Sequence, residues 1–365
     1  MKNTFGGSVA VTLFGESHGP FIGAVLDGMA PGVPVDEGFI ARPLALRRPF
    51  GSISTARVEP DRFQVLSGVF EGKTTGTPLC ILIPNEDARS EDYAALRTLA
   101  RPGHADYTGF VKYHGFADPR GGGHFSGRIT AALVAVGAVA ITALRARGIV
   151  LGTHIARCGG VEDRAFPLDP AAELAALNGK AFAVLDEDAG ERMRAAILAA
   201  AAAGDSVGGI LETAVCGLPA GVGEPWFDTL EGTLAHALFS VPGVKGVDFG
   251  GAFDHADLRG SAYNDAFYTD GGAVKTRTNH AGGINGGVSN GMPLQFRCAV
   301  KPTPSVGMTQ ETVDLRTGED ALLTVTGRHD PAIIHRARVV VDSVTALALC
   351  DALAQRFGTD WPGGL

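Results

Sequence analysis

The sequence predicts an α+β fold with antiparallel sheets and a buried central helix. Strand-like segments come in neighbouring pairs and do not alternate regularly with helices, as they would in a parallel βαβ fold. Residues 129–144 are almost wholly apolar, and a helix that is apolar all round belongs in the interior of a globular chain. These sixteen residues are fewer than the roughly twenty that a membrane span requires, so no membrane association is expected.

Local patterns place the other elements along the chain. The expected strands are apolar runs bounded by turn residues, at 9–14, 22–26, 63–70, 78–83, 209–215, 244–249 and 293–300. The expected helices are 36–46, 188–203, 228–239 and 345–356. Asp36 would cap the first helix, which contains Pro43, and Gly204 would end the second. No repeat or Pro/Ser-rich linker divides the chain, so residues 1–365 are expected to form a single domain.

Composition limits the class of protein. With 45% hydrophobic and 19% charged residues the chain is globular, and its 51 glycines indicate many tight turns and ligand-binding loops. A net charge of -8 argues against a general nucleic-acid-binding surface. The five cysteines are scattered and the ten histidines lack helical metal-pair spacing, which argues against disulfides and a metal site. No secretory signal is readable, so a cytoplasmic location is expected.

One segment imitates a phosphate-binding loop. Gly72-Lys73-Thr74 matches the end of a P-loop, but Ser67 stands where the leading glycine should be, and a strand follows where a helix is required. The glycine-rich segments at 121–123 and 279–291 do not fit Gly-x-Gly-x-x-Gly between a strand and a helix. The sequence therefore predicts neither a P-loop nor a Rossmann dinucleotide site.

Two histidines lie in glycine-rich segments that packing alone does not require. His18 occurs in Gly-Glu-Ser-His-Gly, and His104 in Arg-Pro-Gly-His-Ala-Asp. Glycine removes side-chain cover, and histidine exchanges protons near neutral pH. Asp330 adds a carboxylate in Gly-Arg-His-Asp-Pro, a third such segment. Each residue alone is consistent with a structural turn, but together they favour proton chemistry on an anion.

The glycine run at 121–123 leads through Ser126 and Arg128 into the apolar helix. It would place backbone N–H groups at a helix N-terminus, where anions bind, although a flexible connector explains the run equally well. Arginines flank most of the glycine loops and candidate acids, namely Arg47, Arg48, Arg57, Arg101, Arg128 and Arg328. Guanidinium groups suit carboxylates and phosphates, so the pattern predicts a small polyanionic substrate.

Several segments, in the same order along nearly the whole chain, resemble those of chorismate synthases. They are Gly15–Gly19, Leu66–Phe70, Thr74–Pro78, Arg101–Thr108, Val244–Val247, Asn279–Gly283, Lys301–Thr303 and Gly327–Pro331. Any one segment is weak evidence, whereas their co-occurrence is specific. On this ground the chain is identified as a member of that family.

The resemblance implies conversion of 5-enolpyruvylshikimate 3-phosphate to chorismate and phosphate, the last step of the shikimate pathway. A C6 hydrogen leaves with the C3 phosphate in a 1,4-anti elimination, so the enzyme would be a carbon–oxygen lyase acting on phosphates. The reaction is redox-neutral, yet the family requires reduced FMN, whose electron-rich ring assists departure of phosphate and takes up the weakly acidic hydrogen. The family fold is a β-α-β sandwich with central helices between antiparallel sheets, assembled as a homotetramer.

The resemblance also implies residue roles. His18 would protonate the departing phosphate, His104 would lie by the flavin N1 and C2 carbonyl, and Asp330 would be the basic partner near flavin N5. Ser17 and Ser126 would hold hydrogen bonds in that relay. The substrate's carboxylates and phosphate would be bound by Arg48, Arg101, Arg128 and Arg328. The FMN-binding residues would be Ser126, Gly243, Gly286, Lys301, Thr303, Ser305 and Arg328.

The chain departs from the family pattern in places. Residues 124–128 read His-Phe-Ser-Gly-Arg where the family usually has Arg-Ser-Ser-Ala-Arg, and Ala332 replaces a small polar residue. The cation usually found a few residues after Arg48 is missing, which weakens the case for a bound nicotinamide nucleotide such as NADP. A non-catalytic flavin- or phosphate-binding descendant is the alternative, and the retention of both histidines and Asp330 argues against it. A metal-dependent hydrolase fails on ligand spacing.

Overall fold

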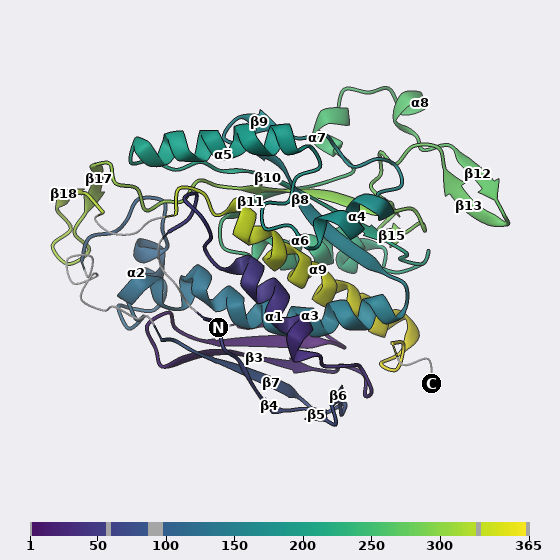
Figure 1. Ribbon diagram of the computed structural model, residues 1–365, viewed down its shortest axis with the longest axis horizontal. Coiled ribbons are helices and arrows are strands. Elements are labelled where there is room, and N and C mark those ends of the chain that lie inside the picture. Colours follow the sequence, from purple (N-terminus) through teal and green to yellow (C-terminus); the bar gives the residue numbers. More distant parts are fainter. Residues whose placement is uncertain (1, 56–59, 87–97, 326–329, 363–365) are drawn as a thin grey trace.

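The computed structural model describes residues 2–55, 60–86, 98–325 and 330–362. Two five-stranded antiparallel sheets enclose a layer of helices, so this part of the chain forms a β-α-β sandwich (Figure 1). The structure confirms the α+β class and the central helices between antiparallel sheets that the sequence and its resemblance predict.

The first sheet has the strand order β1-β2-β3-β7-β4. Its strands are β1 (Thr4–Phe5), β2 (Ala10–Gly15), β3 (Phe21–Asp27), β7 (Leu79–Pro84) and β4 (Gln64–Ser67). Alternate residues of β7 are buried, as expected for a sheet that packs on one face. β2 and β3 pair up to Gly15 and Ile22, so the turn that carries His18 lies at the end of this sheet.

The second sheet has the strand order β11-β16-β10-β8-β9. Its strands are β11 (Val244–Phe249), β16 (Leu294–Val300), β10 (Gly209–Cys216), β8 (Val150–Cys158) and β9 (Val161–Glu162). The helices α4 (Ala171–Leu177) and α5 (Glu187–Ala202) cover its outer face (Figure 1). Its inner face meets the helical layer.

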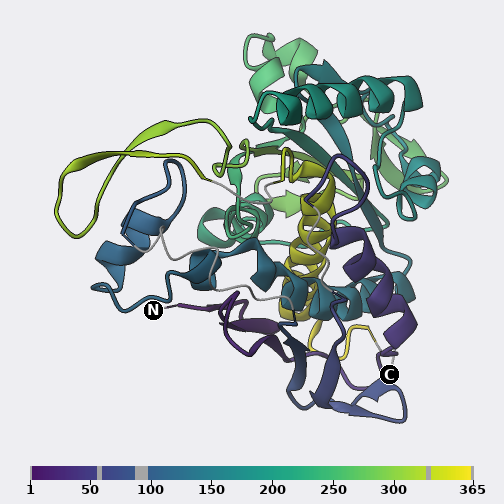
Figure 2. The same cartoon turned by 60° about the vertical axis from the view of Figure 1, so that its left-hand side comes forward.

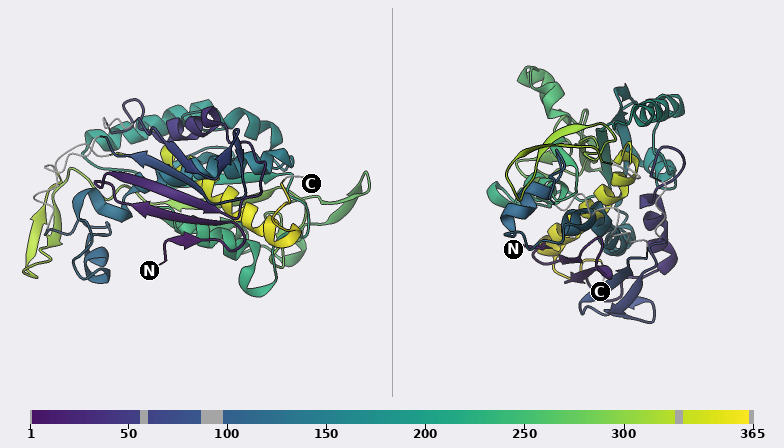
Figure 3. Two further views of the ribbon diagram at one scale, coloured as in Figure 1. Left: turned by 90° about the horizontal axis from the view of Figure 1, so that it is seen from below. Right: turned by 90° about the vertical axis from the view of Figure 1, so that its left-hand side faces the viewer.

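The helical layer consists of α1 (Glu37–Arg47), α3 (Thr130–Ala146), α6 (Leu230–Phe239) and α9 (Ile334–Phe357). α3 contacts the first sheet and α9 the second, and Figure 3 shows the first sheet lying over α9 when seen from below. α3 and α9 cross so closely that a Cβ atom added to Gly137 would lie 2.4 Å from the Cβ of Ser343, which is why this position requires glycine. The stretch Gly127–Ala146 is long and apolar enough for a membrane span, but 83% of its most apolar window is buried inside the protein.

Shorter elements surround the sandwich. The small strands are β5 (Val69–Phe70), β6 (Lys73–Thr74), β12 (Phe267–Asp270), β13 (Ala273–Thr276), β14 (Ile284–Asn285), β15 (Val288–Ser289), β17 (Gln310–Val313) and β18 (Asp320–Leu323). The short helices are α2 (Asp106–Lys112), α7 (Ala252–His255), α8 (Gly260–Tyr263) and the 3-10 turns η3 (Arg120–Phe125), η4 (Gly127–Ile129) and η5 (Trp226–Asp228). The β17–β18 hairpin projects near α2 (Figure 2), and the β12–β13 hairpin projects from the opposite end (Figure 3).

Capping residues explain where the helices start. The Asp36 carboxylate accepts a hydrogen bond from Gly38 N–H at 2.8 Å, as expected for α1. The hydroxyl of Thr229 accepts from Gly232 N–H at 2.9 Å at the start of α6. α5 begins one residue earlier than expected, because Asp186 is its N-cap.

Two expected elements differ from the structure. The strand expected at 63–70 is interrupted at Gly68, whose φ of +81° and close approach to Leu79 separate β4 from β5. β5 then pairs with β6 across the turn that imitates a P-loop, so that segment is a β-hairpin. The helix expected at 345–356 begins at Ile334, and the earlier part of α9 includes the buried polar residues Arg338 and Asp342.

Candidate active site

A cavity of about 720 Å³ lies at the end of the sandwich where α3 and α9 begin. The turn after β2, the end of α1, the loop before α2 and the segments that follow α6 and β16 complete its wall. The cavity brings together most of the residues expected from the sequence, namely His18, Arg101, His104, Ser126, Arg128, Gly243, Lys301, Thr303, Ser305 and Asp330.

His18 is only 7% exposed and is oriented by its neighbour Ser17. Its Nδ1 lies 3.1 Å from the Ser17 hydroxyl oxygen, and that hydroxyl donates to the carbonyl of Arg120 at 3.1 Å. Because the hydroxyl has a single proton, its oxygen accepts from His18 Nδ1–H. The exchangeable proton of the His18 ring is therefore the one on Nε2.

His104 is oriented by a carboxylate. Its Nδ1 donates to Asp106 Oδ1 at 2.7 Å, and Arg101 donates to the same carboxylate through Nε and Nη2, both at 2.8 Å. Burial alone would raise the pKa of Asp106, but the hydrogen bonds from Arg101 and His104 hold it well below its usual value. Asp106 therefore stays ionised and fixes the His104 tautomer, which makes Nε2 the exchangeable position.

The glycine run separates the two histidines. The φ angles are 61° at Gly121, 99° at Gly122 and 54° at Gly123, values that residues other than glycine rarely adopt. A Cβ on Gly121 would lie 2.3 Å from Cε1 of His18, and one on Gly122 would lie 3.0 Å from Cε1 of His104. The run is therefore part of the cavity wall, and its missing side chains leave room for both rings.

Two arginines of the cavity wall share one carboxylate. Asp61 Oδ2 accepts from Arg47 Nη2 at 3.1 Å, and Asp61 Oδ1 forms a short contact with Arg128 Nη1. Arg128 also donates to Asn85 Oδ1 at 2.9 Å and to the Pro84 carbonyl at 3.1 Å. Arg47 and Arg128 line the cavity, whereas Asp61 lies behind them with a fully buried side chain. The cluster carries one net positive charge.

Asp330 is held at the start of α9. One carboxylate oxygen accepts from Thr55 N–H at 2.9 Å, and the other pairs closely with Arg336 Nη1. Arg336 Nε also donates to the carbonyl of Arg47 at 2.8 Å. Asp330 is therefore a positioned carboxylate in the cavity wall, and its side chain is 15% exposed.

The segment after β16 gives the cavity a polar edge. Lys301, Thr303 and Ser305 line it, and the Lys301 ammonium contacts the Gly103 carbonyl closely. Burial lowers the pKa of Lys301, and the charge of Lys245 adds to this effect. Among the described residues the Thr303 hydroxyl is buried without a hydrogen-bond partner. These groups are suited to an anionic phosphate.

Two expected residues lie outside the cavity lining. Arg48 is half-buried and does not line the cavity, in contrast to its neighbour Arg47. Gly286 lies in the exposed turn between β14 and β15, also outside the lining. Arg328 falls outside the described residues.

Sequence reasoning missed several residues that shape the site. Asp106 had a local signal, because a carboxylate two positions after His104 is within reach of its Nδ1. Asp61, Thr55 and Arg336 had none, since their partners are distant in sequence or depend on the fold.

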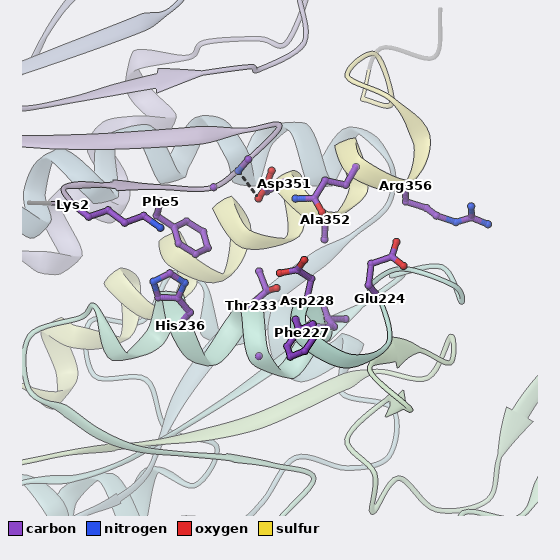
Figure 4. A pocket seen from close by; sticks show the side chains of 16 residues that line it. Lys2, Phe5, Glu224, Phe227, Asp228, Thr233, His236, Asp351, Ala352 and Arg356 are labelled. Carbon is purple, nitrogen blue, oxygen red and sulfur yellow. Dashed lines mark hydrogen bonds between the residues drawn. The ribbon is translucent and has the colours of Figure 1, made fainter.

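A second cavity, of about 350 Å³, lies between β1, the start of α6 and the end of α9 (Figure 4). Asp351 accepts hydrogen bonds there from the N–H groups of Gly7, Ser8 and Val9 at 3.0, 2.7 and 2.9 Å. These bonds anchor the N-terminal segment to α9. The cavity contains none of the residues expected from the sequence to act in the site.

No group of three or more His, Cys, Asp or Glu side chains is placed to hold a metal ion in the part of the chain that the structure describes. All five cysteines are unpaired.

Comparison with known proteins points in one direction. A family model described as chorismate synthase matches residues 9–354. The chorismate synthase of Methanocella arvoryzae is 46% identical over 352 residues, which cover 96% of this chain and 94% of that protein. The enzyme of Dehalococcoides mccartyi is 43% identical over 360 residues, 98% of each chain. A crystal structure of chorismate synthase superimposes with a TM-score of 0.76 at 27% identity, covering 97% of this chain and 94% of the other.

Proposed function

The chain belongs to the chorismate synthase family, and from this membership we propose that it converts 5-enolpyruvylshikimate 3-phosphate to chorismate and phosphate. It is an enzyme of the carbon–oxygen lyase class that acts on phosphates. The proposed reaction removes the C6 hydrogen and the C3 phosphate, so it needs a proton donor for the leaving phosphate and a polyanion-binding cavity.

The charge of the cavity is the observation that carries this proposal. Among the described residues, its lining contains five lysines or arginines but a single carboxylate, that of Asp330. The whole chain has a net charge of -8, so this concentration of cations is local. A substrate with two carboxylates and a phosphate matches such a cavity, and low accessibility strengthens each charge interaction.

His18 is the proposed proton donor to the leaving phosphate. Ser17 keeps its Nδ1 protonated, so the ring is cationic when Nε2 also carries a proton and neutral after Nε2 has given it up. His104, fixed by Asp106, would hydrogen-bond to the flavin ring near N1 and the C2 carbonyl. Asp330 would be a basic group near N5, and Arg101, Arg128 and Arg328 would bind the substrate.

The residues of the cavity also fit FMN. The unpartnered Thr303 hydroxyl, Lys301 and Ser305 are suited to its phosphate, and Ser126 offers a further hydroxyl. Gly243 has φ +94°, and a Cβ there would lie 3.1 Å from Ile333, so the glycine keeps this wall open. Reduced FMN, when bound, supplies electron density that assists loss of phosphate and of the C6 hydrogen. Gly286 and Arg328 remain part of the proposed flavin set on family resemblance alone.

Assembly, domain organisation and location extend the proposal. Residues 1–365 are proposed to act as one domain and to form a homotetramer in the cytoplasm. Exposed apolar side chains on the projecting hairpins, Phe267 at 66% and Leu322 at 69%, support contact with other copies.

An anaerobic assay with 5-enolpyruvylshikimate 3-phosphate and chemically reduced FMN tests the proposal through the absorbance of chorismate. Turnover is expected with reduced FMN and none with oxidised FMN, although both forms should bind. Equal turnover with oxidised flavin, or with no flavin, would contradict it. Tight FMN binding without any turnover would instead favour a non-catalytic descendant.

A further inference from the structure

Asp61 is placed as a shared anchor for two cavity arginines. Each of its carboxylate oxygens contacts one guanidinium group, Oδ2 that of Arg47 and Oδ1 that of Arg128. Burial by itself would raise the pKa of Asp61, but the charges of Arg47 and Arg128 hold it below its usual value. Its backbone has φ +50°, a conformation that aspartate tolerates better than most residues.

Arg47 is incompletely satisfied by this arrangement. It is 5% exposed and lines the cavity, and within the described residues its side chain has one further hydrogen bond, a long one of 3.4 Å to the Gly127 carbonyl. Its Nε is buried without a hydrogen-bond partner among the described residues. Burial lowers the pKa of Arg47 to about 10; Asp61 opposes this, and the charges of Arg336 and Arg128 add to it. A buried cation with this deficit is stabilised by an incoming anion.

We infer that Asp61 is a positioning residue that holds Arg47 and Arg128 as a two-arginine fork for one anionic group of the substrate, a phosphate or a carboxylate. The inference rests on the proposed function for the identity of the substrate. It assigns to Arg47 a place in the anion site that the family resemblance gave to Arg48. Asp61 itself has no exposed side-chain surface and does not touch the anion.

The sign of the effect separates positioning from simple charge balance. Removing the Asp61 charge makes the cavity wall more positive, so electrostatics alone would tighten the binding of an anion. If Asp61 acts by orienting the two guanidinium groups, the same change weakens binding, because bidentate recognition depends on fixed geometry. The two explanations therefore predict opposite changes of Kd.

The test measures calorimetric Kd values without reduced flavin, so that no turnover occurs. The probes are 5-enolpyruvylshikimate 3-phosphate and inorganic phosphate, and the variants are Asp61→Asn and Arg47→Lys. Both variants should bind the substrate roughly tenfold or more weakly, since each breaks the fork by a different route. Their effects should be far from additive in the double variant, because Asp61 acts through Arg47. Restoring the charge with Asp61→Glu should recover part of the affinity.

Asp248→Asn is the matched control. Asp248 is also buried, at 8% exposure, and pairs with an arginine, Arg297, but it lies outside the cavity lining. It should lose stability without losing affinity. Should Asp61→Asn fail to fold, Asp61→Glu tests the positioning role, because it keeps the charge and moves the carboxylate, and Arg47→Lys tests the fork itself.

Unchanged or tighter substrate binding by folded Asp61→Asn, or by Arg47→Lys, would overturn the inference. If the wild-type protein binds phosphate but not the substrate, the proposed function is wrong, and the phosphate data alone decide on the fork. If the wild-type protein binds neither the substrate nor phosphate, the proposed function and the inference about Asp61 are both overturned.

Discussion

The histidines of the cavity and the histidines inside the sandwich differ in how deeply they are buried and in what their rings contact. His18 and His104 each commit one nitrogen to an orienting partner, and both rings lie against the glycine run. His154 and His335 are both 0% exposed and lie away from the glycine run. Burial alone therefore does not single out the residues proposed to transfer protons, since His18 is buried as well; an oriented ring beside an open backbone distinguishes them.

The two interior histidines also differ from each other. His154 lies between two carboxylates, with Asp163 at 2.9 Å and Glu212 at 2.7 Å, and these bonds raise its pKa although burial opposes them. His335 has one partner, Ser54 at 2.8 Å, and burial with the nearby Arg336 charge lowers its pKa to about 4. The first is stabilised as a cation and the second as a neutral ring.

The largest expected effect concerns the cavity histidines. His18→Ala and His104→Ala should each lower kcat by roughly 10²–10⁴, the usual contribution of a positioned proton donor or acceptor. Both lie in glycine loops, so the urea midpoint should change little. Steady-state kinetics and urea unfolding of the two variants measure this. A variant that unfolds easily but keeps its turnover per folded molecule would place that histidine with His154 and His335.

Asp330→Asn should lower kcat by roughly 10²-fold or more, because it removes a basic group beside the proposed flavin ring. Affinity for substrate and FMN should stay the same or tighten slightly, since a carboxylate repels a polyanion. The structure also offers a purely architectural role, as Asp330 joins Thr55 to Arg336.

Separate measurements of kcat and of the two Kd values distinguish these roles for Asp330. Near-normal kcat with weaker binding would show that the carboxylate only fixes the loop. Arg336→Lys is the companion variant, because it keeps a cation beside Asp330 and tests the contact from the other side.

The interior histidines should give opposite pH dependence of stability. Between pH 6.5 and 4 the unfolded chain protonates His335 while the folded chain does not, so His335 costs about 2 kcal/mol at pH 5 relative to pH 8. His335→Gln should remove this loss. His154 stabilises the fold below its unfolded pKa and loses that contribution as pH rises through its raised folded pKa. His154→Gln should therefore cost less at high pH than at pH 6.

Urea unfolding from pH 5 to 9 measures both slopes, with the wild type as reference. Parallel curves for the wild type and His335→Gln would contradict the assignment of a neutral buried ring. Turnover per folded molecule should be preserved in His154→Gln, which lies away from the cavity.

The smallest effect concerns His124, which stands where the family usually has arginine. Its Nδ1 donates to the Gly15 carbonyl at 2.7 Å, so protonation adds a proton at Nε2, and the ring lines the cavity. FMN should bind roughly two- to fivefold more weakly at high pH than at low pH. FMN titrations of the wild type and His124→Arg across pH 5.5–8.5 test this, and identical profiles would exclude it.

The sequence alone predicted those elements and candidate residues whose pattern lies within a few neighbouring positions. Caps, apolar periods and turn glycines predicted most strands and helices, and glycine-flanked motifs predicted His18, His104 and Asp330. It was insufficient where polar residues are buried by partners far along the chain. Asp61 meets Arg128 across 67 positions, and the polar first half of α9 is helical because the fold supplies its partners. Such contacts have no signature in one sequence.

α3 and α9 cross in close contact where Gly137 meets Ser343. The cavity lies toward the start of each helix. At 1.5 Å per residue, Arg128 is about 13 Å from Gly137 along the first helix, and Arg336 is about 10 Å from Ser343 along the second. A methyl group added at Gly137 would push α3 away from α9 and would increase the distance between Arg128 and Arg336. The width of the cavity thus depends on a position deep in the core where a side chain is absent.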